Sequence, residues 1–226
     1  MAKKEVNPQN VTITGRLSFP TLTAEAAYNL SKTGQYPANS PAEAQPSAIL
    51  MLEKAQADKF KDHILNVFLP FVEQREKDGE KRNALSASDV KKLVDATVAN
   101  GNDDTFNTPF KPINEKDEEN FPEAVSKVKL LGNRGVDIKE KAIVNDEAEL
   151  RVNDGSVVIF PVILPIDQSV HEFYPGAQVA ATVNLFAFKN GKLPGYKASI
   201  STLVFKSDSE RIGGSVDVDE DAIFSD

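Results

Sequence analysis

The sequence contains no cysteine and only two histidines among its 226 residues. The missing thiols exclude disulfide bonds, cysteine nucleophiles and cysteine metal sites, and they suit a reducing compartment. His63 and His171 lack the His-Glu-x-x-His spacing of zinc enzymes, so no metal site is predicted. Neither a GxxxxGK[ST] phosphate loop nor a GxSxG nucleophile elbow is present. We therefore expect no enzyme, no catalytic residue and no cofactor.

Long hydrophobic runs are also missing. No stretch approaches the roughly 20 apolar residues that span a bilayer, so no membrane partner is expected. Residues 1–10 contain two lysines without an apolar core behind them, which does not predict a secretory signal. With 40% hydrophobic and 27% charged residues, the composition is typical of a soluble globular protein. The length allows one large domain or two small ones.

Acidic residues are absent from three windows, although the whole chain has a net charge of −8. These windows are residues 6–24, 125–135 and 173–207. Their cations are Arg16, Lys127, Lys129, Arg134, Lys189, Lys192, Lys197 and Lys206. Because phosphate contacts require only a local basic strip, this segregation keeps nucleic acid open as a partner of an acidic chain.

The N-terminal region predicts two strands. Residues 11–19 alternate strictly, with Val11, Ile13, Leu17 and Phe19 on the apolar side. Gly15 falls on that side too, where a bulge or a close backbone approach would explain it. The strand is expected to end at Pro20, and residues 48–52 form a second, shorter apolar run after a loop at 31–47.

A helical insertion is predicted at about residues 53–100. The first helix, 56–76, carries an apolar stripe, and Pro70 is expected to kink or restart it. The stripe consists of Phe60, Ile64, Phe68 and Phe71. The second helix spans 89–100, with Ser88 as its expected N-cap and Asn100-Gly101 as its C-cap.

The second half of the chain is predicted to be mainly strands. After a polar loop at 101–122, residues 125–131 alternate, with Val128 and Leu130 opposite Lys127 and Lys129. Residues 139–150 are expected to form a short helix. Residues 155–165 contain two prolines, which suits an edge or irregular strand.

The clearest strand pattern comes late in the chain. Residues 178–189 and 196–206 are predicted to be two long strands, with clear alternation at 179–188 and 196–201, and residues 190–195 predict a hairpin loop between them. Several strands interrupted by helices predict a mainly β fold with a helical insertion (α+β), and the oligonucleotide-binding (OB) barrel is the simplest such fold.

The last twelve residues, SVDVDEDAIFSD, contain five carboxylates, no cation and one apolar pair. The preceding 214 residues carry 26 basic and 29 acidic side chains, so they are far less acidic per residue. A short terminal acidic run cannot bury itself, so we expect residues 215–226 to be a disordered acidic tail. Residues 1–214 are expected to form the OB-fold domain.

The segment EFYPGAQVAATVNLFAFKNGKLPGYKASISTLVFKSDSERIGG, residues 172–214, resembles OB-fold replicative single-stranded-DNA-binding proteins of tailed bacteriophages, with those of enterobacterial phages as the nearest likeness. The FYPG turn, the strand ending in NLFAF, the hairpin and the GG before the tail carry the resemblance. The opening VTITGRLSFP and the place of the helical insertion also fit. The resemblance implies sequence-independent coating of single strands during phage DNA replication and recombination, in the host cell cytoplasm.

The resemblance also implies a C-terminal tail that docks replication proteins such as a polymerase, helicase or primase, and that competes for the DNA groove. Residues expected to serve this tail function are Asp217, Asp219, Glu220, Asp221, Ile223 and Phe224. Cations that follow phosphates and rings that stack on bases are what single-strand binding requires. The residues expected to contact DNA are Arg16, Tyr36, Phe110, Lys111, Lys127, Lys129, Arg134, Tyr174, Lys189, Lys192, Tyr196 and Lys197.

Each of these residues also has an ordinary structural explanation. Strand rings such as Phe186 and Phe188 suit a packed core, and any one lysine suits a solvated surface. A second hypothesis is a structural or adaptor protein of a virion, which would need an exposed apolar patch in place of a basic one. A third is an OB protein that binds RNA or duplex DNA.

Overall fold

The structure is a computed structural model that describes residues 7–34, 37–99, 107–138, 142–151, 157–162, 173–207 and 209–212. Its strands are β1 Asn10–Thr21, β2 Ser47–Glu53, β3 Phe110–Lys111, β4 Ala124–Leu131, β5 Ala142–Arg151, β6 Val157–Val162, β7 Gln178–Asn190 and β8 Leu193–Ser207. Its helices are α1 Ala24–Ser31, α2 Lys54–His63, the π-helix η1 Ile64–Phe68, α3 Leu69–Lys77, α4 Ala87–Val98 and α5 Glu115–Asn120.

Five of the strands close into a barrel. The sheet runs β3-β4-β2-β1-β7-β8-β5-β6, and an additional pairing joins β4 to β8. The closing pair is parallel, with Leu130 opposite Ala198, whereas the pairs β1–β2, β2–β4, β1–β7 and β7–β8 are antiparallel. This connectivity is that of an OB fold, and the predicted fold class is confirmed.

Alternation in the sequence places the barrel core correctly. Val11, Ile13 and Leu17 of β1 are buried, as are Val128 and Leu130 of β4. The odd-numbered residues from 179 to 187 of β7 are also buried, while the even-numbered ones are partly exposed. Within β1, a Cβ at position 15 would collide with the side chain of Leu52, so the predicted close approach at Gly15 is confirmed.

Phe19 departs from this pattern. The alternation predicts that its ring faces inward, but its side chain is 53% exposed. The β1–β2 register shifts between Ser18 and Thr21, and Phe19 has a backbone φ of +45°. The irregularity turns the ring outward, because an extra residue in one strand reverses the side of every residue beyond it.

The predicted first helix is one rod with a π-helical turn in the middle. Phe60, Ile64 and Phe68 are fully buried, and Phe71 packs against the same core. Pro70 lies in the first turn of α3, directly after η1. Since proline has no N–H to donate, the wider turn before it accommodates the missing hydrogen bond, and the predicted restart at Pro70 is confirmed.

Helix α4 begins two residues earlier than predicted. Its N-cap is Ser86, whose Oγ accepts a hydrogen bond from the Asp89 N–H, so the prediction of Ser88 was wrong. Two short helices were not predicted. Helix α1 starts after the N-cap Thr23, and α5 starts at a capping box formed by Asn114 and Asp117.

The predicted helix at 139–150 is wrong, because β5 occupies most of this segment. Ala142 pairs with Leu203 in a parallel ladder with β8, and the rest of β5 pairs with β6. Inter-strand hydrogen bonding over ten residues overrides the local helix preference. β6 is the edge strand of the sheet, as the prolines of residues 155–165 predicted.

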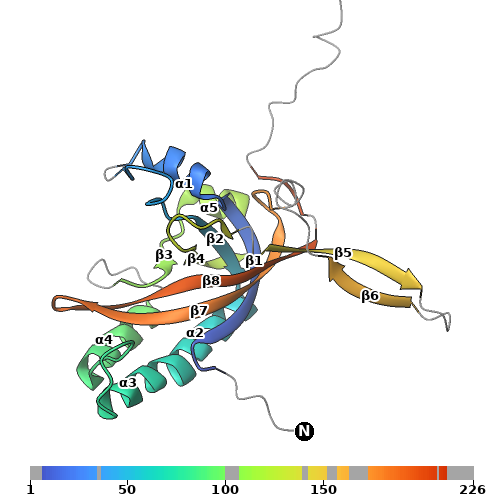
Figure 1. Cartoon of the computed structure of the whole chain (residues 1–226). Helices are drawn as coiled ribbons and strands as arrows, with labels where there is room; N and C mark the ends of the chain where they lie inside the picture. The colour runs from blue at the N-terminus through green and yellow to red at the C-terminus, as the bar shows by residue number, and fades with distance from the viewer. Residues whose placement is uncertain are drawn as a thin grey trace, which may run out of the picture.

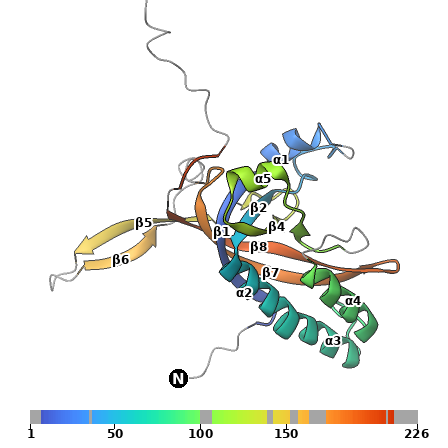
Figure 2. The same cartoon turned by 180° about the vertical axis from the view of Figure 1, so that it is seen from behind.

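The helices lie on two sides of the barrel (Figure 1). Helices α2, α3 and α4 run beneath β7 and β8, whereas α1 and α5 lie on the opposite side (Figure 2). The β7–β8 hairpin and the β5–β6 hairpin project from the barrel in opposite directions (Figure 1). Within the described residues, none of the helices has the length and apolarity needed to cross a membrane, and no cluster of His, Asp or Glu is arranged to hold a metal.

Candidate nucleic-acid interface

The outward-facing side of β1, β2 and β4, called here the outer face, carries two rows of paired residues. Because directly opposed residues in a ladder point to the same side of a sheet, each row crosses all three strands. The first row contains Arg16, Met51 and Lys127. The second row contains Ser18, Ile49 and Lys129. The two rows have different surroundings.

The first row lies under α5. The Lys127 Nζ is 2.7 Å from the Asp117 Oδ2 of α5, and these side chains are only 14% and 9% exposed. Met51 is buried against Phe121 and Ile212 in a small second core. Lys127 is therefore neutralised by an internal ion pair, and its charge holds α5 to the barrel.

Arg16 has an equally complete set of internal partners. Its guanidinium donates to the carbonyl oxygens of Gly176 and Glu210 and forms a 3.0 Å ion pair with Glu123. It also lies 5.1 Å from the centre of the Phe121 ring. These contacts join β1 to the segment that follows β8, which gives Arg16 a structural role in this conformation.

In the second row Ser18 is buried and Ile49 packs on the small second core, whereas Lys129 lines a basic cleft. The cleft, of about 240 Å³, lies where β4 meets the start of β8, and β3 and the residues before it form its other wall. Its cations are Lys111 from β3, Lys129 from β4 and Lys197 from β8, all exposed. The described residues that complete its lining are Gln45, Asn107, Thr108, Pro109, Leu131, Tyr196 and Ala198, none of which is acidic. The cleft thus concentrates positive charge at the seam of the barrel.

The barrel seam itself aligns two of these lysines. Leu130 and Ala198 are partners in the parallel β4–β8 ladder, and both are buried. The residues just before them, Lys129 and Lys197, therefore both point outward from adjacent strands. Among the described residues, Lys129 has no ion-pair partner.

Beside the basic cleft, the Phe188 ring lies next to Lys197. The Lys197 Nζ lies 5.2 Å from the centre of the half-buried Phe188 ring. A Cβ at Gly195 would collide with both Phe188 and Asn107, so this glycine lets three chain segments meet. The Tyr196 N–H also donates to the Asn107 carbonyl oxygen, at 2.8 Å. The close packing of Gly195 against Phe188 and Asn107 thus positions the Phe188 ring beside the cleft.

Two rings expected to stack on bases lie in the core instead. Tyr196 is fully buried, packs edge-on against Phe68 and shares a hydrogen bond of 2.7 Å between its hydroxyl and the Thr97 Oγ1. Burial raises the pKa of the Tyr196 hydroxyl far above its usual value, and the hydrogen bond lowers it only in part. Phe110 is 1% exposed and packs against Phe60. This burial corrects the expectation of base stacking at both positions.

The remaining predicted residues are dispersed. Lys192 is exposed at the tip of the projecting β7–β8 hairpin, and Arg134 is exposed in the loop after β4. Lys189 pairs with the buried Asp89. Burial raises the pKa of Asp89, but the hydrogen bonds from Lys189 and Ser86 and the charges of Lys189 and Lys92 together lower it below its usual value. Tyr174 lines a different pocket, described below. Tyr36 and the tail residues Asp217, Asp219, Glu220, Asp221, Ile223 and Phe224 lie outside the described residues.

The sequence reasoning missed several residues at the interface. Gln45 and Asn107 line the cleft, but they sit in loops whose position depends on contacts distant in sequence. Phe188 was assigned to the core by its strand pattern. Phe19 was assigned to the core as well, and only the Phe19-Pro20 dipeptide hints at an irregular strand end.

Comparison with known proteins gives a likeness at the level of structure. No protein-family model and no curated protein matches the chain. The single-stranded DNA-binding protein from bacteriophage Enc34 in complex with ssDNA has a similar structure, with a TM-score of 0.50 and 12% identity over 93% of this chain and 97% of that chain. This likeness shows the fold.

Two further solved structures have lower scores. The Enc34 protein in another structure gives a TM-score of 0.49 at 13% identity, over 98% of this chain and 97% of that chain. The single-stranded DNA binding protein gp2.5 of bacteriophage T7 gives 0.43 at 11% identity, over 96% and 94% of the two chains. At these identities, function must be argued from the side chains of this chain.

Proposed function

We propose that this protein binds single-stranded DNA without regard to sequence, by holding the phosphate backbone in the basic cleft. The observation that carries the proposal is the convergence of Lys111, Lys129 and Lys197 from three different strands on one cleft, whose described lining residues include no acidic side chain. A groove of cations with a ring at its rim is what sequence-tolerant single-strand binding requires. Phe188 supplies such a ring beside Lys197.

The fold is compatible with this role. OB barrels bind oligonucleotides across the face that the second and third barrel strands form. Here these strands are β2 and β4, and Lys129 lies on β4. A protein of this fold, that of bacteriophage Enc34, has been solved in complex with ssDNA. We infer a non-catalytic role in coating and protecting single strands during phage DNA replication and recombination in the host cytoplasm.

The direct test is fluorescence anisotropy of a labelled oligo-dT at several salt concentrations. The variant Lys111→Ala/Lys129→Ala/Lys197→Ala should weaken binding by roughly tenfold or more and reduce the slope of log K against log salt by about 2. The matched control removes three exposed lysines outside the cleft, Lys59, Lys81 and Lys91, and should change neither. No binding by the unmodified protein at low salt would refute DNA binding and favour the protein-binding adaptor.

We propose in addition that residues 215–226 bind replication proteins and compete with DNA for the basic cleft. The tail brings five carboxylates to a chain whose cleft holds three lysines, and tethering gives it a high effective concentration. A protein ending at residue 214 should bind oligo-dT more tightly, most clearly at low salt. Equal or weaker binding by the truncated protein would contradict the competition.

A further inference from the structure

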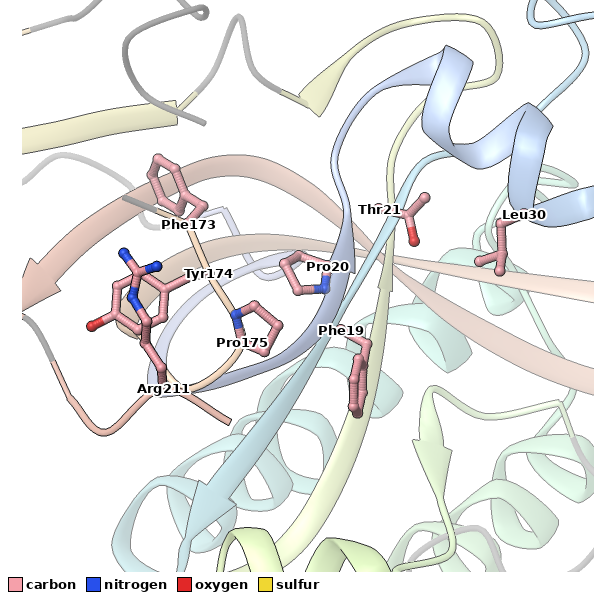
Figure 3. Close-up of a pocket in the computed structure, with 8 residues that line it drawn as sticks. All are labelled: Phe19, Pro20, Thr21, Leu30, Phe173, Tyr174, Pro175 and Arg211. Atoms are coloured by element: carbon pink, nitrogen blue, oxygen red, sulfur yellow. The ribbon is translucent and has the colours of Figure 1, made fainter. Parts of the chain in front are cut away.

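A second pocket, of about 500 Å³, lies at the end of β1 and is lined largely by rings (Figure 3). Phe19 and Pro20 form one side, and Phe173, Tyr174 and Pro175 form the other. Figure 3 shows the Phe19 ring apart from the aromatic rings of Phe173 and Tyr174, with Pro20 and Pro175 between them in this view. The cation of the pocket is Arg211, whose guanidinium lies 4.4 Å from the centre of the Tyr174 ring.

Phe19 is held in the pocket by an unfavourable backbone conformation. A φ of +45° is rare for any residue other than glycine and is an outlier for an aromatic one. The side chain is 53% exposed, so burial of the ring in the core does not offset the cost of this strained backbone. Strained residues of this kind concentrate at ligand sites, and bulges often re-aim a side chain toward one.

The opposite wall is fixed by hydrogen bonds. The Tyr174 hydroxyl donates to the carbonyl oxygen of Ser209 and accepts from its N–H, both at 2.9 Å. The Ile212 N–H donates to the Pro175 carbonyl oxygen at 3.0 Å. The pocket is thus preorganised between a rigid wall and an exposed ring.

The pocket lies on the same outer face as the basic cleft. Phe19 lies beside Lys116 of α5, and the next residue of α5, Asp117, pairs with Lys127 of the outer face. Two strand spacings, about 10 Å, separate β1 from β4. Since OB folds cover about 4–16 nucleotides, one bound strand would reach both places.

The charges suit the base of a nucleotide better than its phosphate. The Lys116 Nζ lies 6.0 Å from the centre of the Phe19 ring, and Arg211 covers Tyr174. Glu210, however, neighbours Arg211, and α5 is mostly acidic. A neutral, flat group between the rings avoids these carboxylates, while the two cations attract the strand that carries it.

We infer that this pocket receives one unstacked base of a bound single strand, stacked on Phe19. The inference rests on the proposed function and extends the DNA path from the basic cleft to the end of β1. Leu30, which is 62% exposed on the pocket rim, contributes apolar contact but no stacking. An apolar peptide segment of a partner protein is the competing occupant.

The test uses Phe19→Gly, because glycine tolerates the positive φ and should preserve or raise the thermal midpoint. We expect its affinity for oligo-dT to fall by about fivefold or more, the fold-change that corresponds to loss of one stacked base. Phe19→Trp should retain binding, and Leu30→Ala should change affinity by less than about twofold. An oligonucleotide with 5-iododeoxyuridine should crosslink to Phe19 on irradiation.

The outcomes separate this inference from the proposed function. If the unmodified protein binds oligo-dT but Phe19→Gly binds equally well and no crosslink forms, the base pocket is refuted and DNA binding stands. If Leu30→Ala weakens binding as much as Phe19→Gly, stacking is refuted in favour of apolar contact. If the unmodified protein does not bind oligo-dT, the proposed function itself fails.

Discussion

Lys127 and Lys129 are two residues apart on one strand and point to the same side, but they have opposite roles. Lys127 is 14% exposed and pairs with Asp117, whereas Lys129 is exposed and lines the basic cleft. The difference comes from α5, whose Asp117 pairs with Lys127, whereas Lys129 lies beyond this contact and is exposed in the basic cleft. A basic strand pattern therefore does not by itself identify a binding face, because a short acidic helix converts half of it into internal structure.

Of the two lysines, Lys127 is the internal one, and its removal is expected to have the largest effect on the free energy of unfolding. Lys127→Ala leaves the Asp117 carboxylate almost buried without its cation, which should cost about 1–3 kcal/mol in the free energy of unfolding. Urea denaturation measures the loss. Adding Asp117→Asn should restore part of it, since the orphaned charge disappears, and the salt dependence of DNA binding should stay unchanged. A double variant less stable than the single variant would contradict this ion-pair role.

A smaller effect is expected at Lys189, which is half exposed but neutralises the buried Asp89. Lys189→Ala should cost about 1 kcal/mol, because Asp89 keeps its hydrogen bond from Ser86. The folded-state pKa of Asp89 is lowered below 3.8, so its contribution to stability is present above that pH and is lost as the pH falls through the folded pKa. The variant should therefore lose less stability on acidification than the unmodified protein, as measured by urea denaturation between pH 5 and 2. An equal loss would contradict the linkage.

The external member of the pair should change binding and leave folding intact. Lys129→Ala is expected to weaken oligo-dT binding by about three- to fivefold and to reduce the salt slope by about 0.7, the value for one phosphate contact with a single strand. Its urea midpoint should match that of the unmodified protein. Anisotropy titrations at two salt concentrations measure this change. If Lys129→Ala destabilised the protein and left the salt slope unaltered, Lys129 would have the structural role assigned here to Lys127.

The smallest effect is expected at Lys54, whose ion pair with Asp58 is exposed at both ends. Lys54→Ala should change the free energy of unfolding by less than about 0.5 kcal/mol, because solvent screens such pairs. Urea denaturation of Lys54→Ala and Lys127→Ala side by side compares the stability lost from an exposed ion pair with that lost from the pair covered by α5. Comparable losses in the two variants would show that coverage by α5 adds nothing to the Lys127 pair.

The barrel could be predicted from the sequence because most of its strands alternate, while the shorter β2 was identified by its apolar run. Where one face is buried, a period of two residues fixes both the strand and its inward side, as in β4 and β7. The same reasoning fails at Phe19, since a bulge inserts a residue and reverses the alternation beyond it. It fails at residues 139–150 because the strand there is stabilised by β8, a partner distant in sequence.

The sequence identifies the types of residue at the candidate site, but it does not show which of them are exposed. Acid-free windows include Lys129 and Lys197, which the structure brings into one cleft, and their contact with DNA stays a prediction. The same windows contain Tyr196 and Lys127, and nothing local distinguishes a lysine under α5 from one beside it. Asp117 is the partner that decides the role of Lys127, and the loop-like composition around it concealed the helix that presents it.

The pairing of β1 with β7 joins residues that are far apart in the chain. Val11 lies opposite Val183, so the first strand of the barrel cannot find this partner until nearly the whole domain has been made. At roughly 5–20 residues per second, translation of the intervening chain takes about 10–30 s. During this interval one edge of β1 is unpaired, and unpaired edges invite association with other chains. The barrel is therefore expected to fold late and slowly. Its risk of aggregation depends on how long translation leaves β1 unpaired, and the folded structure does not determine this time.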